Sequence, residues 1–217
     1  MVYIYNQEPP ARQKYRVFRN EGQSIITYAQ QMPLLIADKR VPITVAQVIE
    51  QRLNSQNPDW KKYFSTGDMI ASHPNGNIKL VRDAQILREI TPKTSLDDGT
   101  IMLADGVYET LEGAEFRRSD LVFEEGLDAE DAKVHPVWQF IARDGALLEE
   151  YVMFLKRESQ FRCTKAMGLY LPSIPKSPKA RALYIDWLEN GSTLNGRIDL
   201  LSLFGRLVGV APEIEEE

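Results

Sequence analysis

The sequence VHPVWQFIARDGALLEEYVMFLKRESQ, residues 134–160, is the most strongly patterned stretch of this chain. Small or apolar residues recur in it three or four positions apart, at Trp138, Ile141, Gly145, Leu148, Val152 and Leu155. This spacing puts them on one side of an α-helix. The pattern predicts one long helix over residues 136–158, roughly 35 Å in length, whose apolar side must be covered by other parts of the chain.

Charged residues lie on both sides of this predicted helix. Acidic residues precede it, and basic residues lie at or beyond its C-terminal end: Glu124, Glu125, Asp128, Glu130, Asp131, and then Lys156, Arg157 and Arg162. Such an order complements the helix dipole, so helix construction accounts for part of the charge pattern. Because residues 124–133 are acidic and poor in large aliphatic side chains, we expect an exposed connector there. It would join an N-terminal part, residues 1–123, to a C-terminal part, residues 134–212.

Composition bounds the class of protein. With 217 residues, the chain is long enough for one large domain or two small ones, and its 43% hydrophobic and 26% charged residues are typical of a soluble globular protein. We find neither an apolar run long enough for a membrane span nor a signal peptide at the start. Cys163 is the single cysteine, which excludes an intramolecular disulfide and favours the cytoplasm. A net charge of −5 gives no overall attraction to nucleic acid.

The N-terminal part is expected to be a mixed or antiparallel sheet with short helices. Thr44 and Gln47 fit a capping box at the start of a helix over residues 45–53. This helix could begin a helix-turn-helix, but the polar residues after it favour a core-packing role. Ser24 is expected to cap another helix, which Pro33 would end. Strands are predicted over residues 3–5, 15–18, 34–37 and 100–103, and a helix, capped by Asp105 and stopped by Gly113, over residues 107–111.

Two Asn-Gly dipeptides predict β-hairpins with two-residue type I′ turns. The first, Asn75-Gly76, would pair Ile70 with Val81, and residues 84–90 after it fit either a strand or a helical turn. The second, Asn190-Gly191, would place Tyr184 opposite Arg197. With a strand over residues 206–210, the second hairpin forms a predicted three-stranded antiparallel meander that packs on the long helix. Residues 213–217 are expected to be a disordered acidic tail.

Few residues suggest catalytic chemistry. Two histidines, His73 and His135, are too few for a multi-histidine metal site, and no phosphate-binding loop, kinase or serine-hydrolase signature occurs. Cys163 lies near basic residues that favour a thiolate, but no base is evident beside it. We therefore assign no catalytic, cofactor-binding or metal-binding residue. Aspartates on or beside predicted strands could still gather a magnesium ion, as in a metal-dependent hydrolase or nuclease: Asp68, Asp83, Asp186 and Asp199.

The basic stretch, residues 156–181, is the best candidate for an interaction surface. Its possible interaction residues are Lys156, Arg157, Arg162, Lys165, Tyr170, Lys176, Lys179 and Arg181. Basic side chains could hold phosphates while an aromatic ring stacks on a base, which makes nucleic-acid binding an alternative. The acidic segments on either side could instead neutralise them. Prolines at 172, 175 and 178 suit a polyproline II segment, either as a docking element or as an ordered surface loop.

These patterns predict an α+β fold and a soluble cytoplasmic protein. The expected function is that of a non-enzymatic binding or assembly module, with a protein partner or self-association, and with no membrane contact. A nucleic-acid-binding protein and a metal-dependent hydrolase remain the alternatives.

Overall fold

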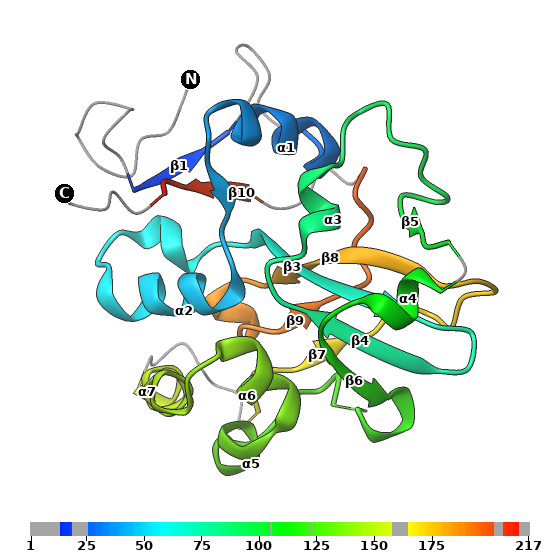
Figure 1. Cartoon of the computed structure of the whole chain (residues 1–217). Coiled ribbons are helices and arrows are strands. Elements are labelled where there is room, and N and C mark those ends of the chain that lie inside the picture. The colour runs from blue at the N-terminus through cyan, green and yellow to red at the C-terminus, as the bar shows by residue number, and fades with distance from the viewer. Residues whose placement is uncertain are drawn as a thin grey trace.

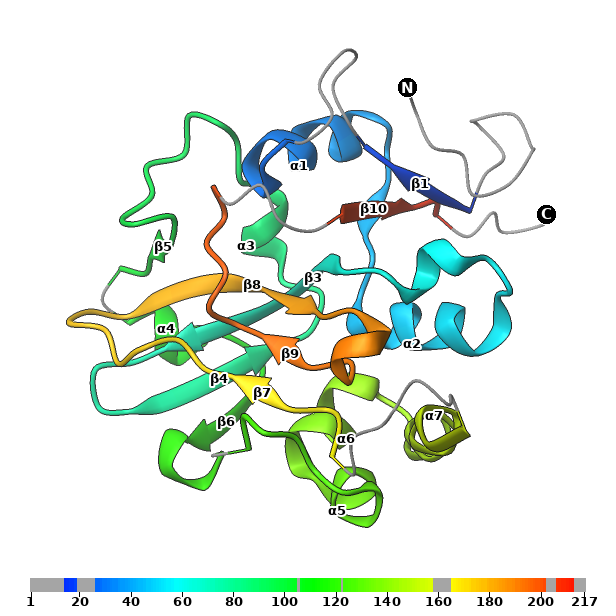
Figure 2. The ribbon, with the colours of Figure 1, turned by 180° about the vertical axis from the view of Figure 1, so that it is seen from behind.

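Ten strands form one sheet in the computed structural model, which describes residues 14–18, 26–104, 106–121, 123–157, 165–201 and 206–212. The chain has an α+β fold (Figures 1 and 2). The central strand β3 (Phe64–Ser72) is buried along its whole length. It pairs antiparallel with β4 (Asn77–Val81) and β8 (Lys179–Ile185), and parallel with β10 (Arg206–Val210).

Shorter strands extend the sheet on every side. β6 (Ala114–Arg117) pairs with β4, and β5 (Ile101–Met102) and β9 (Leu194–Asn195) pair with β8, while β7 (Leu169–Tyr170) pairs with β9. β1 (Tyr15–Val17) and β2 (Val41–Pro42) pair antiparallel with β10. Strands from both sides of residues 124–133 therefore belong to one sheet.

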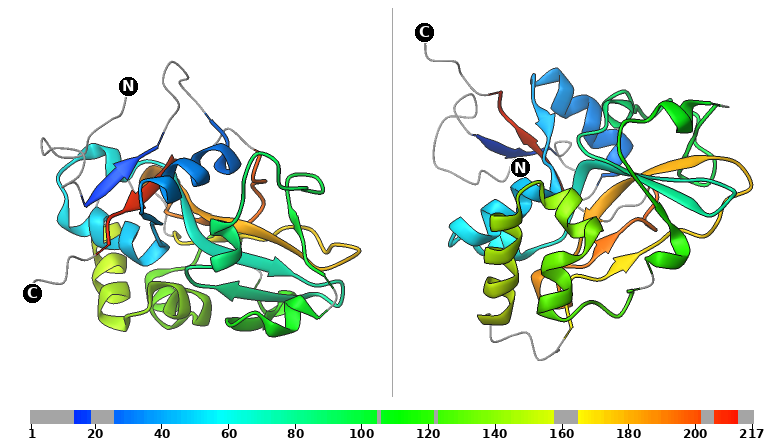
Figure 3. Two further views of the ribbon diagram at one scale, coloured as in Figure 1. Left: turned by 45° about the horizontal axis from the view of Figure 1, so that its top comes forward. Right: turned by 60° about the horizontal axis from the view of Figure 1, so that its bottom comes forward.

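Helices cover both faces of the sheet. Alternate residues of β3 and β8 point to opposite faces, and each set belongs to its own apolar core. On one face, Ile70, Leu183 and Ile185 belong to a core with α2 (Val45–Asn54), α5 (Ala129–Val134), α6 (Pro136–Ala142) and α7 (Gly145–Arg157). On the other, Met69 and Ala182 belong to a second core with α1 (Tyr28–Ala37), α3 (Gln85–Arg88) and α4 (Val107–Thr110). Figure 3 shows this arrangement from two further sides.

The single long helix predicted over residues 136–158 is wrong, because the structure has two helices there. Arg143 has a left-handed backbone, with φ 68°, and ends α6. Asp144 then accepts a hydrogen bond from the N–H of Ala146 (2.8 Å), which starts α7 in a new direction. The predicted apolar side is nevertheless buried in one core on both helices, at Trp138, Ile141, Leu148, Val152 and Leu155.

The first hairpin forms, but its predicted register is wrong by one residue. Ile70 lies opposite Leu80 instead of Val81. The N–H of Gly76 donates to the His73 carbonyl (3.0 Å), and Gly76 has φ 88°. Pro74 therefore occupies the second position of a type I turn, which suits its fixed negative φ, and Gly76 takes the left-handed position after it.

The predicted three-stranded meander is also wrong. Tyr184 lies opposite Asn195 instead of Arg197, because the turn contains a 3-10 helix, η4 (Leu188–Asn190), and two left-handed residues, Gly191 and Ser192. After β9 the chain crosses the sheet, and β10 pairs with β1, β2 and β3 instead of with β9.

In the N-terminal part, one predicted helix is confirmed and other predicted elements are wrong. The capping box of Thr44 and Gln47 and the helix after it are confirmed. Pro33, however, lies inside α1, which begins at a second capping box on Thr27 and replaces both the predicted helix stop and the strand over residues 34–37. Two 3-10 helices, η2 (Pro58–Lys61) and η3 (Arg118–Asp120), were not predicted. Ser24, Asp105 and residues 3–5 and 213–217 lie outside the described residues.

The predicted connector contains a helix. Asp128 accepts hydrogen bonds from the N–H groups of Glu130 and Asp131 and so starts α5, which packs against α6 and α7. The division of the chain into an N-terminal part, residues 1–123, and a C-terminal part, residues 134–212, stays a prediction. Within the described residues, no helix is both long and apolar enough to cross a membrane.

Candidate binding site at the proline-rich loop

A cavity of about 90 Å³ lies where β3, β8 and the proline-rich loop, residues 171–178, meet. The pairing of β3 with β8 builds its floor, because Ile70 lies opposite Arg181 and Ser72 lies opposite Lys179. These four side chains share one face of the sheet. The residues that line the cavity are Ile70, Ser72, Asp98, Pro172, Ser173, Pro175, Lys179 and Arg181.

The proline-rich loop is held in place by three backbone anchors. The Arg118 guanidinium donates to the Pro172 carbonyl, and Arg197 Nε donates to the Leu171 carbonyl (2.8 Å). At the other end, the N–H of Leu103 donates to the Pro178 carbonyl (3.0 Å). The loop therefore forms a supported wall of the cavity.

The cavity combines charged side chains with a buried hydroxyl. Lys179 forms an ion pair with Asp97 (2.6 Å). Arg181 is half-buried, and desolvation lowers the pKa of its guanidinium, while Asp199 and Asp98 act against this shift from a distance. Ser72 is only 6% exposed, and its Oγ has no hydrogen-bond partner among the described residues. A buried hydroxyl without a partner costs free energy that a ligand can recover.

The structure brings together only some of the residues predicted from the basic stretch. Lys179 and Arg181 line the cavity, and Lys176 is exposed on the loop directly after the lining residue Pro175. Tyr170 lies in β7, with the Arg197 guanidinium 5.2 Å from the centre of its ring.

The other predicted interaction residues lie elsewhere. Lys156, near the end of α7, forms an ion pair with Glu130 (3.4 Å), and Lys165 pairs with Glu125 (3.9 Å). Arg157 is exposed at the end of α7. Arg162 is outside the described residues, as is Cys163.

The four aspartates considered for a magnesium site do not converge. Asp186 Oδ1 accepts from the N–H of Trp187, and Asp199 Oδ1 accepts from the N–H of Leu201 (2.8 Å in both cases). Each carboxylate is therefore bound to a backbone group close to it in the sequence. In the described part of the chain, no group of three or more His, Cys, Asp or Glu side chains could hold a metal ion.

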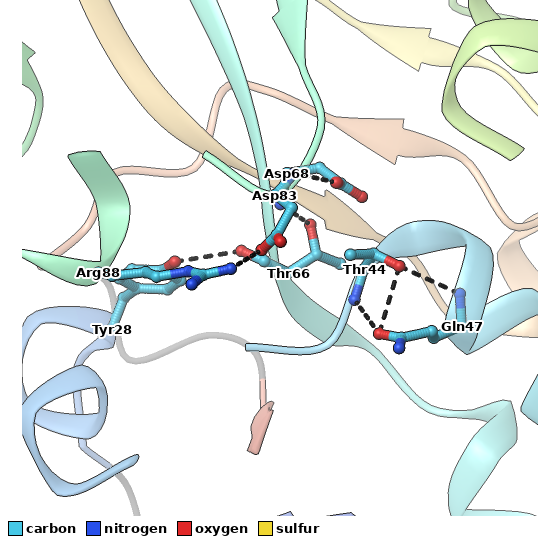
Figure 4. A network of polar contacts seen from close by, with 7 residues as sticks. All are labelled: Tyr28, Thr44, Gln47, Thr66, Asp68, Asp83 and Arg88. Carbon is cyan, nitrogen blue, oxygen red and sulfur yellow. Dashed lines mark hydrogen bonds and ion pairs between the residues drawn. The ribbon is translucent and has the colours of Figure 1, made fainter. Parts of the chain in front are cut away.

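Asp68 belongs to a buried structural network instead (Figure 4). Its carboxylate accepts from the N–H of Val45 (2.6 Å), at the start of α2, and from the N–H of Asp83 (2.9 Å). Asp83 pairs in turn with Arg88 (2.5 Å). Asp68 is fully buried, and desolvation raises its pKa to about 6.

Both histidines have local roles. His73 packs against Tyr108, with 4.8 Å between ring centres. His135 Nδ1 accepts from the N–H of Val137 (3.3 Å) and so caps α6, and desolvation lowers the pKa of His135.

Sequence reasoning missed Ser72 and Asp98 as cavity residues. Nothing in the local sequence marks them, since Ser72 ends a strand and Asp98 belongs to an Asp-Gly turn. β3 pairs with β8, which lies more than a hundred positions later in the chain. Only this pairing places Ser72 beside the two cations Lys179 and Arg181.

Comparisons with known proteins show a likeness in fold. No protein-family model matches the chain, and a search of curated proteins finds no match. The chain is similar to a solved structure described as "Accommodation of massive sequence variation in Nanoarchaeota by the C-type lectin fold". The TM-score is 0.63 with 14% sequence identity, over 91% of this chain and 95% of that chain. At this identity the likeness shows the fold alone, which is the C-type lectin fold.

Proposed function

We propose that this chain is a non-enzymatic binding module that recognises a protein partner. Its recognition surface is defined here as the proline-rich loop, the cavity, and residues 97–102. The observation that carries the proposal is the cavity itself, in which a buried, unpartnered Ser72 hydroxyl lies beside Arg181 and Lys179.

Exposed apolar side chains border this cavity. Ile174, on the proline-rich loop, is 56% exposed, and Met102, in β5, is 43% exposed. Leu103 and Pro178 join β5 to the loop through the backbone hydrogen bond described above, so the two segments lie side by side. Apolar and methionine side chains beside arginine are typical of protein interfaces.

Two observations favour protein recognition over phosphate binding. Lys156 already pairs with Glu130 in α5, and Lys165 pairs with Glu125 before it, which reduces the positive charge that these lysines offer to a nucleic acid. In addition, the similar structure is described as accommodating massive sequence variation. A framework that tolerates such variation suits a chain whose loops carry the recognition surface.

The test is affinity capture of partners from the native host, followed by cross-linking through Lys176 and mapping by mass spectrometry. Ile174→Asp places a charge in the recognition surface. Val134→Asp is the matched control, because Val134 is 68% exposed on α5, away from the proline-rich loop (Figure 2).

We expect Ile174→Asp to lose a partner that Val134→Asp retains, with cross-links from Lys176 to that partner. A partner bound equally by both variants would refute the assignment of the surface. Nucleic acid co-purifying with the chain, and lost at raised salt, would favour the nucleic-acid-binding alternative.

A further inference from the structure

Arg181 differs from Arg52, a buried arginine with a structural role. Arg52 donates to the carbonyls of Trp60, Lys62 and Asp186 and to the hydroxyls of Tyr151 and Ser192. The Arg181 guanidinium donates only to the Arg197 carbonyl and forms no ion pair within the described part of the chain. Several of its N–H groups are therefore free for a ligand in a half-desolvated setting.

The Ser72 side chain lines the same cavity as Arg181. Because Ser72 pairs with Lys179 and Ile70 pairs with Arg181, Ser72 and Arg181 are diagonal neighbours on one face of the sheet. Diagonal neighbours are about 7–8 Å apart between Cα atoms, a distance that one small group between their side chains can bridge. A planar group with two oxygens fits both the guanidinium fork and the hydroxyl.

The surrounding charges indicate a singly charged group. The ion pair of Lys179 with Asp97 leaves Arg181 as the cation available to a ligand. Asp98, exposed at the rim, accepts no hydrogen bond among the described residues, and its carboxylate would repel a doubly charged phosphate more strongly than a singly charged carboxylate. The same carboxylate can accept a backbone N–H from a peptide. A cavity of about 90 Å³ is also smaller than the roughly 300–1,000 Å³ of sites that enclose a whole small molecule.

We infer that the cavity receives an aspartate or glutamate side chain of the protein partner. Its carboxylate binds Arg181 and Ser72, and the partner's adjacent backbone N–H donates to Asp98. This inference rests on the proposed function and names the chemistry by which the same surface recognises its partner.

The test is a titration of the whole chain followed by NMR of the arginine Nε–H signals. The probes are N-acetyl-aspartate N-methylamide, its neutral asparagine counterpart, and inorganic phosphate. We expect the aspartate probe to shift the Arg181 signal saturably. The asparagine probe should bind about tenfold more weakly, since a charge-assisted hydrogen bond is roughly twice as strong as a neutral one.

Three variants test the residues. Arg181→Gln should abolish binding of the aspartate probe, whereas Lys39→Gln, which removes an exposed cation after α1 and outside the recognition surface, should leave it unchanged. Ser72→Ala removes only the unpartnered hydroxyl, so it should leave the fold intact and weaken binding about tenfold or more, the size of one hydrogen bond to a charged group. Ser72→Ala therefore decides the question even if Arg181→Gln unfolds.

Each failure has a distinct meaning. Equal binding of the aspartate and asparagine probes, or binding insensitive to Ser72→Ala, overturns the carboxylate site. If a captured partner still depends on Ile174, the proposed function survives that failure. Saturable binding of the aspartate probe without any partner that depends on Ile174 would leave the carboxylate site and refute the proposed function.

Discussion

Asp68 gives the most quantitative prediction, because it is a fully buried carboxyl without a cation bound to it among the described residues. Desolvation raises its pKa from the ordinary 3.8 to about 6, although the N–H groups of Val45 and Asp83 oppose this shift. Its protonation therefore favours the folded state. This contribution to stability is complete below about pH 3.8 and is lost as the pH rises through about 6.

The size of this contribution follows from the pKa difference. A shift of about two units corresponds to about 3 kcal/mol, of which about 2 kcal/mol falls between about pH 4.5 and about pH 7.5. Asp68→Asn removes the titration. It also turns an amide NH₂ towards the N–H of Val45 or Asp83, which costs about 1–3 kcal/mol at every pH.

The assay is urea unfolding at a series of pH values, followed by tryptophan fluorescence. The cost of Asp68→Asn should be larger at about pH 4.5 than at about pH 7.5, by about 2 kcal/mol. Glu112→Gln, at an exposed position, controls for the loss of one negative charge. A cost that is constant with pH, or that grows towards pH 7.5, would refute the argument, because the two N–H groups would then outweigh burial.

Three further predictions concern the free energy of unfolding, measured by urea denaturation. Arg52→Met should cost about 3–5 kcal/mol, because it leaves one buried and two partly buried carbonyls without their donor; a cost below about 1 kcal/mol would mean that water replaces the guanidinium. Gly113→Ala should cost about 2 kcal/mol, since a Cβ there would lie 2.2 Å from the Leu80 carbonyl oxygen, and an unchanged midpoint would contradict this close approach. Lys39→Gly should gain about 0.5–1 kcal/mol, because Lys39 has φ 56° and is exposed after α1, and a loss would show that the lysine side chain matters there.

Sequence reasoning succeeded where a feature depends on neighbouring residues. The capping box of Thr44 and Gln47 is such a feature, because both hydrogen bonds form within one turn of helix. Gly113 shows the limit of this reasoning. Its sequence position suggests a helix stop, but its backbone approaches Leu80 in β4, the strand that pairs with β6, and only tertiary structure shows that approach.

Turn geometry accounts for the main errors in the predicted fold. The dipeptide Asn75-Gly76 predicts a hairpin correctly, but Pro74 before it selects a type I turn and shifts the register by one residue. In the same way, the helical spacing from Trp138 to Leu155 is real on both sides of Arg143, whose left-handed backbone divides the helix. A periodic pattern reports which side is buried, not whether the helix is continuous.

The candidate site could be predicted only in part. Charge singled out Lys179 and Arg181, but it singled out Lys156 equally, and the structure places Lys156 beside Glu130. Ser72 carries no charge and no motif. Its place in the cavity comes from strand pairing across the chain, which one sequence does not reveal.

The pairing of β1 with β10 has a mechanical consequence. Tyr15, the first residue of β1, lies opposite Val210, the last residue of β10, and Val17 lies opposite Val208. Tension that pulls the two ends of the chain apart therefore acts across the Tyr15–Val210 pair first and opens the strands one residue pair at a time. Strands loaded in this way unzip under a small force, whereas sheared strands must break all their hydrogen bonds together. As β10 peels away it also leaves Phe64 of β3, so a pull on the ends exposes the central strand early.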